Sequence, residues 1–221
     1  MTETLRVAVE ASSTDGLSAW NYSPFKRLVD VVLAGVLLSF VSPVLLIIAV
    51  LIRLDSAGPV FFRQQRAGKA GRLFRLIKFR TMVHGGNDVG PKVTRAGDKR
   101  VTSLGQILRK WKLDELPQLF NVIRGDMAFV GPRPDIPEYL AELTLAQVQI
   151  LHLRPGITGM ASIQYRNEEQ LLLGVQESEL PRYYCTHVLP EKLRIDLEYA
   201  RRASFFSDLG VLFQTLRALV H

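Results

Sequence analysis

The chain has 221 residues, of which 48% are hydrophobic, a composition that allows a buried core and excludes an intrinsically disordered protein. It carries 28 lysines and arginines against 21 aspartates and glutamates, a net charge of +7. Seven of the basic residues lie between residues 56 and 87, where no acidic residue occurs, so the excess charge is confined to one segment. The single cysteine, Cys185, excludes an intrachain disulfide, and the four histidines lack the spacing of zinc ligands.

A polar leader, residues 1–25, opens the chain, and its serine- and threonine-rich composition fits neither a signal peptide nor a transit peptide, so we expect it to be poorly ordered. Lys26 and Arg27 then precede an almost unbroken apolar run over residues 31–52. A run of this length is a candidate membrane helix. On length alone it would be a single spanning helix, or a long core helix of a soluble protein.

Two features of the apolar run favour a different arrangement. Ser42-Pro43 stands at its centre, and a proline inside a helix removes a backbone hydrogen bond and kinks the helix. Both flanks are basic, so the positive-inside rule places both ends on the cytoplasmic side. We therefore predict that residues 26–55 form a re-entrant helix hairpin in one leaflet, with Ser42 bonded to a carbonyl that the proline frees.

The rest of the chain, residues 56–221, is predicted to be one helix-rich α+β domain at the membrane face. Alternating apolar residues indicate a small β-hairpin with strands at 60–65 and 73–79. A glycine-rich stretch, residues 85–97, predicts a loop of the length that is often functional. Helical spacing of apolar residues follows at 104–111, 116–123, 139–152, 193–199 and 209–220.

Several of these short helices carry tryptophan, phenylalanine or arginine at their edges, as interfacial amphipathic helices do. The alternative for each helix is that it packs into a soluble core. The last helix, residues 209–220, could also pack against a second copy of the chain, so a homodimer is an open expectation.

Adjacent carboxylates, Asp114 and Glu115, precede Pro117, which marks the first turn of the next helix. The helix macrodipole at that position stabilises an ionised carboxylate, and a nucleophile or a Mg²⁺ ligand has to be ionised. The alternative is plain helix capping. Since the chain contains neither GxxxxGK[ST] nor GxGxxG, a phosphorylated substrate would be held by arginine and a metal ion.

Two basic segments are candidates for that role. Arg133 lies between Pro132 and Pro134, which stiffen the backbone and reduce the entropy lost when the arginine binds an anion. The alternative is a surface connector. Lys78 and Arg80 end the basic hairpin, and their alternative role is a solvated edge strand that blocks aggregation.

Taken together, these motifs resemble those of the monotopic phosphoglycosyl transferases, bacterial enzymes that start glycoconjugate assembly on polyprenyl phosphate. The resemblance runs from about residue 26 to 215 and rests on the segments KRLVD, LDELPQLFNVIRGDM, VGPRP, LRPGITGMASIQYRN and DLEYARRASFFSD. LDELPQL followed by VGPRP at this distance is highly specific for the family.

The resemblance implies that Asp114 attacks the β-phosphorus of a UDP-sugar, releases UMP and carries the sugar phosphate as a covalent intermediate. Glu115 would support this step by positioning or as a general base. A polyprenyl phosphate such as undecaprenyl phosphate would then take the sugar phosphate, and Mg²⁺, with Asp114 as its protein ligand, would screen the diphosphate. The expected location is the cytoplasmic face of the bacterial inner membrane, in contact with lipid.

The resemblance further implies substrate contacts from Lys78, Arg80, Arg109 and the Pro132-Arg133-Pro134 segment, and matches Arg166 and Asp208 to weaker parts of the family pattern. The sequence departs from that pattern at Trp111-Lys112 and at residues 160–162, which leaves the sugar and the glycan pathway open.

The main alternative is a membrane-anchored module that binds nucleic acid or acidic lipid through the basic hairpin, since seven positive charges also suit a phosphate backbone. Its aromatic residues are not arranged as exposed stacking surfaces, and we expect no nucleic acid partner. A third alternative is an inactive scaffold for glycan assembly.

Overall fold

The structure is a computed structural model that describes residues 2–86, 92–140 and 143–220. It is a helix-rich α+β arrangement, as the sequence predicts. The α-helices are α1 (Thr2–Ala11), α2 (Pro24–Asp55), α3 (Ser103–Lys110), α4 (Gln118–Arg124), α5 (Leu145–Val148), α6 (Met160–Gln164), α7 (Glu168–Leu171), α8 (Leu180–Tyr183), α9 (Leu189–Arg202) and α10 (Phe205–Val220). The strands are β1 (Phe61–Ala67), β2 (Leu73–Phe79), β3 (Ala128–Val130) and β4 (Gly156–Thr158).

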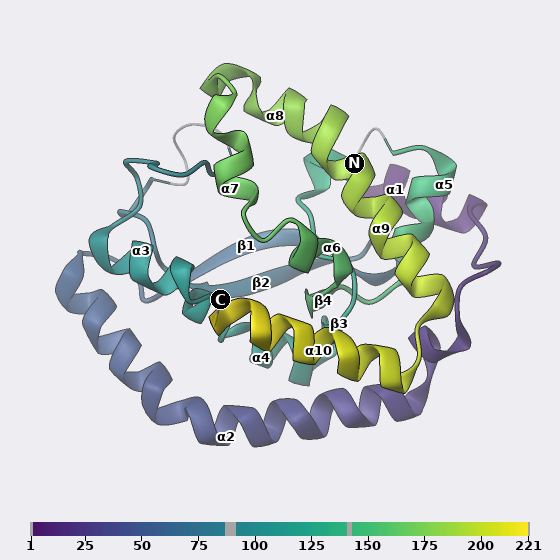
Figure 1. Ribbon diagram of the computed structural model, residues 1–221, viewed down its shortest axis with the longest axis horizontal. Helices are drawn as coiled ribbons and strands as arrows, with labels where there is room; N and C mark the ends of the chain where they lie inside the picture. Colours follow the sequence, from purple (N-terminus) through teal and green to yellow (C-terminus); the bar gives the residue numbers. More distant parts are fainter. Residues whose placement is uncertain (1, 87–91, 141–142, 221) are drawn as a thin grey trace.

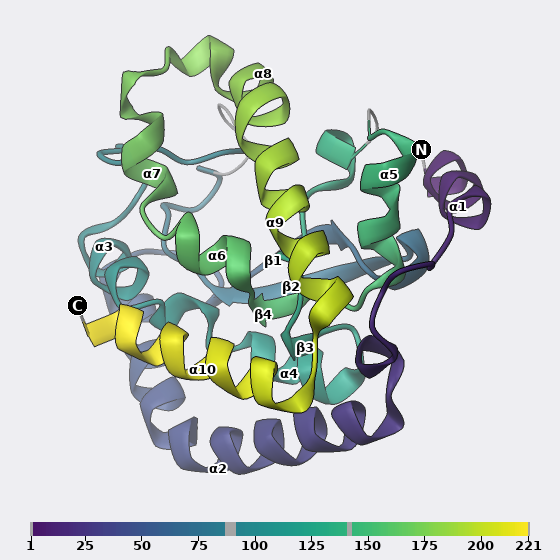
Figure 2. The same cartoon turned by 45° about the vertical axis from the view of Figure 1, so that its right-hand side comes forward.

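Short single turns join these elements. The 3-10 turns are η1 (Ala19–Tyr22), η2 (Lys69–Gly71), η3 (Leu113–Glu115), η4 (Pro137–Leu140), η5 (Gln149–His152), η6 (Leu172–Gly174) and η7 (Glu177–Glu179), and η8 (Tyr184–Val188) is a π-helical turn that runs into α9. Figures 1 and 2 show α2 along one side of the molecule and α7 and α8 on the other, with β1 and β2 between them.

The predicted β-hairpin is confirmed: β1 and β2 pair antiparallel, with Phe61 opposite Phe79 and Ala67 opposite Leu73. Its second strand has the predicted bounds, and its first begins one residue later and ends two residues later than predicted. α4 supports the hairpin through Asn121, which is fully buried. The Asn121 side chain accepts a hydrogen bond from the Ile77 N–H at 3.1 Å and donates one to the Arg75 carbonyl at 2.8 Å. The hairpin is thereby fixed against the helix that follows the two carboxylates.

A second, parallel pair of strands, β3 and β4, holds the loop that contains Arg133. The two backbones approach closely there: a Cβ on Gly131 would lie 2.4 Å from the Arg154 carbonyl oxygen, and one on Gly156 would lie 2.2 Å from the Gly131 nitrogen. Both positions therefore require glycine. The Pro132 carbonyl accepts a hydrogen bond from the Gly156 N–H at 2.9 Å, so the start of the proline-flanked segment is pinned to β4.

The apolar run lies in α2, a continuous helix that contains Pro43 and is long and apolar enough to cross a membrane. It is one helix bent around Pro43 (Figure 1), so the predicted re-entrant hairpin over residues 26–55 is not confirmed as a pair of separate helices. The Ser42 hydroxyl donates to the Ser39 carbonyl at 2.9 Å. That carbonyl is the one whose helical partner Pro43 removes, as the sequence predicts.

Both ends of α2 are bonded to other parts of the chain, the start through Lys26 and Arg27 and the end through Arg80. At its start, Lys26 forms an ion pair with Asp208 of α10, and Arg27 donates to the carbonyls of Val122 and Ile123 at 2.6 and 2.9 Å. Between the ends, Ala34, Ile48 and Ile52 are buried against the domain. Most other side chains of the run face outward; Phe40 within the run and Leu54 just after it are each 79% exposed.

The polar leader, for which the sequence indicated little order, contains α1 and η1. Val9 of α1 is buried in the same apolar cluster as Leu151 and Leu189. Asn21 donates to the Ala200 carbonyl at 2.7 Å, and Ser18 donates to the Ala203 carbonyl at 2.6 Å. These partners lie more than a hundred residues along the chain, which is why composition alone did not predict the contacts.

The other helix predictions differ in their bounds. Those at 104–111 and 116–123 correspond to α3 and α4, and those at 193–199 and 209–220 are the cores of the longer α9 and α10. The expected helix over 139–152 is broken into η4, α5 and η5, and residues 141 and 142 within it lie outside the described residues. The predicted loop over 85–97 contains no helix or strand in its described part, while its residues 87–91 lie outside the described residues.

Candidate functional site

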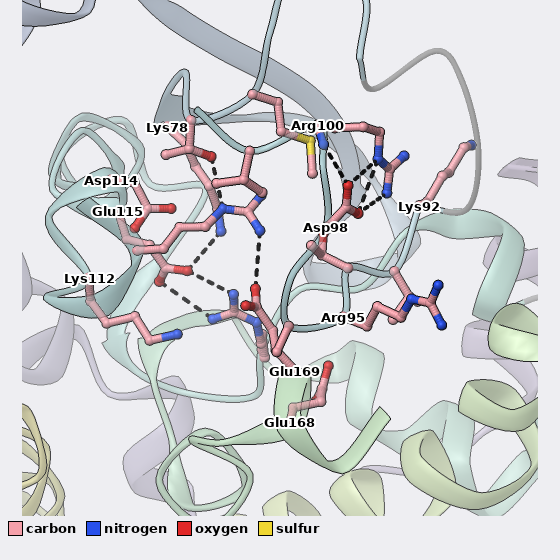
Figure 3. Close-up of a pocket in the computed structure, with 18 of the residues that line it drawn as sticks. Lys78, Lys92, Arg95, Asp98, Arg100, Lys112, Asp114, Glu115, Glu168 and Glu169 are labelled. Atoms are coloured by element: carbon pink, nitrogen blue, oxygen red, sulfur yellow. Dashed lines mark hydrogen bonds and ion pairs between the residues drawn. The ribbon is translucent and has the colours of Figure 1, made fainter. Parts of the chain in front are cut away.

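A cavity of about 680 Å³ opens between β2, α3, the loop after β3 and the start of α7. Figure 3 shows Asp114 and Glu115 on one side of it and Asp98, Arg95 and Lys92 on the other. The predicted site residues that line it are Lys78, Arg109, Asp114, Glu115, Arg133 and Arg166. The remaining predicted substrate residues, Arg80, Pro132, Pro134 and Asp208, do not line it.

The two carboxylates belong to the 3-10 turn η3, between α3 and α4, and not to the first turn of α4 as the sequence suggested. Lys112 turns the chain between α3 and η3 with a left-handed φ of 55°, a conformation that costs a non-glycine residue about 1–2 kcal/mol. Gly105 lets α3 lie against the end of β2, since a Cβ there would be 2.1 Å from the Thr81 carbonyl oxygen. The site is therefore built by a tight turn between two short helices.

Glu115 is held by two cations from separate segments. Its Oε1 lies 2.7 Å from Lys78 Nζ and 2.8 Å from Arg133 Nη2, and its Oε2 lies 3.4 Å from Arg133 Nη1. Lys78 comes from β2, opposite Phe62 of β1, and Arg133 from the loop after β3. The Glu115 carboxylate therefore joins the hairpin, the η3 turn and the proline-flanked loop.

Asp114 has a different environment although it is the next residue. It is buried, and its Oδ1 receives no hydrogen bond from any residue that the structure describes. This buried oxygen belongs to a cavity whose lining also includes the cationic side chains of Lys78, Arg109 and Arg133.

The pKa values of the two carboxyls move in opposite directions. Burial raises the pKa of Asp114, and the nearby Lys78 ammonium only partly offsets this. Burial would also raise the pKa of Glu115, but the Arg133 guanidinium and the Lys78 ammonium outweigh it and hold that pKa well below its usual range. The expected lowering of the Asp114 pKa by a helix macrodipole is therefore wrong, because burial dominates and α4 starts only at Gln118.

Arg109 reaches the cavity from α3. Its Nε donates to Thr81 Oγ1 at 2.9 Å, and its Nη1 lies 3.1 Å from Glu169 Oε1 of α7. Arg166 lines the cavity just before α7, and within the described part of the chain its side chain has no hydrogen bond or ion pair. Arg166 can therefore turn to an anion in the cavity, and Arg109 can do so by exchanging Glu169, whose side chain is half exposed.

Two predicted substrate residues are used elsewhere in the fold. Arg80 is buried, and its guanidinium donates to the carbonyls of Ile52, Ser56 and Ala57 at the end of α2, at 3.2, 2.6 and 2.9 Å. Asp208 lies at the start of α10, where Lys26, Trp20 Nε1 at 2.8 Å and Tyr199 Oη at 2.6 Å satisfy its carboxylate. The sequence alone did not distinguish Arg80 and Asp208, which stabilise the fold, from the charged residues that line the cavity.

The proline carbonyls also act structurally. Pro132 bonds β4, as described above, and the Pro134 carbonyl accepts a hydrogen bond from Arg66 Nη1 at 3.0 Å. Both prolines are buried, so they fix the backbone on either side of Arg133.

A buried polar network beside Arg133 was missed by the sequence analysis. Tyr184 Oη donates to Asp135 Oδ1 at 2.8 Å, and Lys192 Nζ donates to Tyr184 Oη at 3.1 Å and to Glu168 Oε2 at 2.7 Å. The network ties the loop of Arg133 to the start of α7, next to Arg166. The sequence contains one indication of this network. Lys192 lies on the same helical face as the buried Leu189 and Leu193, and a buried lysine requires an acidic or polar partner.

The site fits a magnesium ion only with help from a substrate. Among the described residues there is no cluster of three or more His, Cys, Asp or Glu side chains that could hold a metal. Mg²⁺ commonly binds one or two carboxylates together with substrate phosphates and water. Asp114, with its unpartnered Oδ1, is the carboxylate available for this, because both oxygens of Glu115 are engaged.

Comparison with known proteins gives one family, described as bacterial sugar transferases, which matches residues 21–221. A UDP-glucose:undecaprenyl-phosphate glucose-1-phosphate transferase of Caulobacter vibrioides is 39% identical over 208 residues, which cover 88% of this chain and 69% of that protein. The exopolysaccharide production protein ExoY of Rhizobium meliloti is 36% identical, over 88% of this chain and 84% of its own length.

A third relative is much longer than this chain. The UDP-N-acetylgalactosamine-undecaprenyl-phosphate N-acetylgalactosaminephosphotransferase of Aeromonas hydrophila is 34% identical over 90% of this chain, which spans only 44% of that protein. The sugars in the relatives' names differ, so the comparisons do not select one sugar.

The opposite environments of the two carboxyls predict opposite effects on stability at neutral pH. Asp114→Asn should raise the free energy of unfolding, because the folded-state pKa lies above the ordinary 3.8 and ionisation at higher pH therefore opposes folding. Glu115→Gln should lower it by about 3 kcal/mol, because two buried cations lose their shared anion. Thermal and denaturant unfolding of both variants would measure this.

The pH dependence of the free energy of unfolding is the control for this prediction. The contribution of Glu115 is present above its ordinary pKa of 4.5 and is lost as the pH falls through its lower folded-state value. Equal destabilisation by both substitutions at neutral pH would contradict the assignment.

Proposed function

Because the chain belongs to the bacterial sugar transferase family, we propose that it transfers a sugar 1-phosphate from a UDP-sugar to undecaprenyl phosphate. The transfer would pass through a covalent phosphosugar on Asp114 and release UMP. The observation that carries this proposal is the contrast within the adjacent pair, in which Glu115 is fully engaged by Lys78 and Arg133 while Asp114 Oδ1 is free.

In the first step, an Asp114 carboxylate oxygen forms a bond to the β-phosphorus of the UDP-sugar. The bond from that phosphorus to the bridging oxygen breaks, and this oxygen leaves as part of UMP. The product on the enzyme is an acyl phosphate between Asp114 and the sugar 1-phosphate. Burial raises the pKa of Asp114 and makes its carboxylate a more basic nucleophile than an exposed one.

In the second step, a phosphate oxygen of undecaprenyl phosphate attacks the same phosphorus. The bond to Asp114 breaks, and the free carboxylate and a polyprenyl diphosphosugar result. Lys78 and Arg133 share one carboxylate, so together with Glu115 they leave one net positive charge beside the reacting phosphorus. This charge and Arg109 oppose the negative charge that develops during transfer.

A magnesium ion held by Asp114 and the diphosphate would supply charge screening and polarisation of the phosphate oxygens. The role of Glu115 is to orient Lys78 and Arg133. With its pKa well below the usual range, Glu115 stays ionised and is a poor general base, so positioning is favoured of the two roles that the family resemblance allows.

We also propose that α2 enters and leaves the membrane on one side, the cytoplasmic face. The contacts of both its ends support this, since Lys26 and Arg27 bind α10 and α4, while Arg80 binds residues at its other end. One domain on one side of the membrane cannot hold both ends of a helix that crosses a hydrocarbon core of about 30 Å. The exposed apolar face of α10, formed by Phe206, Leu209, Phe213 and Leu216, would lie in the interface beside it.

The alternative of a nucleic-acid-binding module is disfavoured by where the basic residues lie. Arg66, Lys78 and Arg80 of the basic segment are used in hydrogen bonds within the domain. The exposed ones are Arg63, Lys69, Arg72 and Arg75. The segment is therefore divided between the interior and the surface and does not form one phosphate-binding stripe.

The nucleophile assignment predicts the outcome of a burst experiment. Asp114→Asn should lose UMP release from any UDP-sugar by at least about a thousandfold, while the protein stays folded. In the wild type without undecaprenyl phosphate, intact-mass spectrometry should show one sugar phosphate added per chain, and peptide mapping should place it on Asp114. Full UMP release by the asparagine variant would refute the assignment.

The raised pKa of Asp114 predicts the acid side of the pH profile. Because only the ionised carboxylate attacks, UMP release should decline on acidification at a pH above 3.8, the ordinary value for aspartate. Lys78→Met removes a charge that lowers this pKa, so the decline should move to higher pH whatever happens to the maximal rate. An acid limb that stays in place in this variant would contradict the prediction.

The membrane arrangement predicts which side a label reaches. In a chain with Cys185→Ser, cysteines introduced at Ser13 and at Lys99 should both react with membrane-impermeant maleimide only after the cell membrane is opened. Ser13 precedes α2 and Lys99 follows it, and both are exposed. Labelling of the Ser13 position in intact spheroplasts would show that α2 spans the membrane.

A further inference from the structure

The cavity has two chemically different ends. At one end lie Asp114 and Glu115, and at the other lies the loop of residues 92–100, whose Lys92, Arg95 and Asp98 are among the residues that line the cavity (Figure 3). The carboxylates of α7 lie between these ends in the same view. The proposed reaction uses the first end and leaves the second without a role.

The chemistry of the first proposed step, the attack of Asp114 on the donor, assigns a role to the second end of the cavity. In phosphoryl transfer the attacking oxygen, the phosphorus and the leaving oxygen are roughly in line. Asp114 is the attacking group and is itself buried, so the leaving group has to lie on the far side of the phosphorus, in the open part of the cavity. The sugar oxygen, which stays bonded to phosphorus, lies off this line.

We propose that the loop of residues 92–100, together with Tyr139, is the subsite for the nucleoside monophosphate half of the donor, the part that leaves as UMP. This inference rests on the proposed function, because the in-line argument takes Asp114 as the nucleophile. It assigns an orientation to the donor: uridine toward Arg95, sugar toward Asp114.

The cations of this subsite are available to a ligand. Lys92 Nζ lies 2.8 Å from Glu138 Oε1, with both side chains about half exposed, and Arg95 Nη2 lies 3.6 Å from Glu177 Oε2. Exposed pairs of this kind contribute about 0–1 kcal/mol, so a phosphate can replace their carboxylates. Negative charge accumulates on the leaving phosphate, and cations at this end stabilise it.

The rest of the subsite is held in a defined conformation by hydrogen bonds and by packing. Arg100 holds both carboxylate oxygens of Asp98, at 3.0 and 3.1 Å from Nε and 2.6 Å from Nη2, and this fixes the turn of the loop. Val93 and Ile136 are buried, and Tyr139 is half-buried with its ring 5.3 Å from that of Tyr184. This apolar and aromatic wall suits the face of a pyrimidine ring.

The subsite is also joined to Arg109. The Ala96 N–H donates to the Glu169 carbonyl at 2.9 Å, and the Glu169 carboxylate binds Arg109. One residue of α7 therefore sets the spacing between the loop and an arginine at the centre of the cavity.

The test compares three single substitutions in the full chain, reconstituted in nanodiscs. Lys92→Gln and Arg95→Gln remove one cation each from the subsite. Lys99→Gln is the matched control, because Lys99 is an exposed lysine of the same loop that does not line the cavity. The KM for UDP-glucose, the KM for undecaprenyl phosphate and the inhibition constant of UMP are measured for each.

For Lys92→Gln and Arg95→Gln, the UDP-glucose KM and the UMP inhibition constant should each rise about tenfold, the effect of losing one charge-assisted hydrogen bond. The undecaprenyl phosphate KM and all constants of Lys99→Gln should stay unchanged, because UMP has left before the acceptor reacts. A raised acceptor KM with an unchanged UMP constant would overturn the inference and assign this end to the acceptor.

Failure of the proposed function gives a different result. In that case the wild type releases no UMP from any UDP-sugar. Calorimetric titration with UMP alone then still tests the subsite: binding to the wild type that weakens in Arg95→Gln and not in Lys99→Gln supports it. Equal UMP affinity in all the proteins would overturn it.

Discussion

One carboxylate, that of Glu115, determines how the cavity is built. Lys78 and Arg133 come from segments more than fifty residues apart, and without an anion between them their charges would repel each other in a buried place. Glu115 brings both within hydrogen-bond distance, and both of its carboxylate oxygens contact Arg133. Asp114, the next residue along the tight η3 turn, is then the acidic group whose Oδ1 stays unpartnered. The division of roles follows from geometry, because two neighbouring side chains in such a turn point to different surroundings.

Much of the local structure could be predicted from the sequence. Alternating apolar residues located β1 and β2, the apolar run located α2, and Ser42 bonds the carbonyl that Pro43 leaves free. The adjacent Asp114 and Glu115 and the proline-flanked Arg133 were singled out, and they lie together in the cavity. These features depend on neighbours within a few residues, which a sequence displays directly.

The rest depends on distant partners. Neither the burial of Asp114 nor the two cations on Glu115 can be derived from residues near position 114, so the opposite directions of their pKa values could not be predicted from the sequence. The basic side chain of Arg80 looked equivalent to that of Lys78 and is bonded elsewhere. The network of Tyr184 and Lys192 joins residues of η8 and α9 to the loop after β3, and only the packing of those elements makes it visible.

The bonds of Arg80 have a consequence for how the apolar helix should be regarded. Arg80 is buried, and its guanidinium donates hydrogen bonds to the carbonyls of Ile52, Ser56 and Ala57. It follows Lys78, the residue of β2 that binds Glu115, by only two positions. Cutting away α2 to obtain a water-soluble fragment would remove the Ile52 carbonyl from this buried arginine and would leave its other acceptors, Ser56 and Ala57, on a free chain end. α2 is thus a structural part of the domain that contains the cavity, and it cannot be treated as a detachable segment.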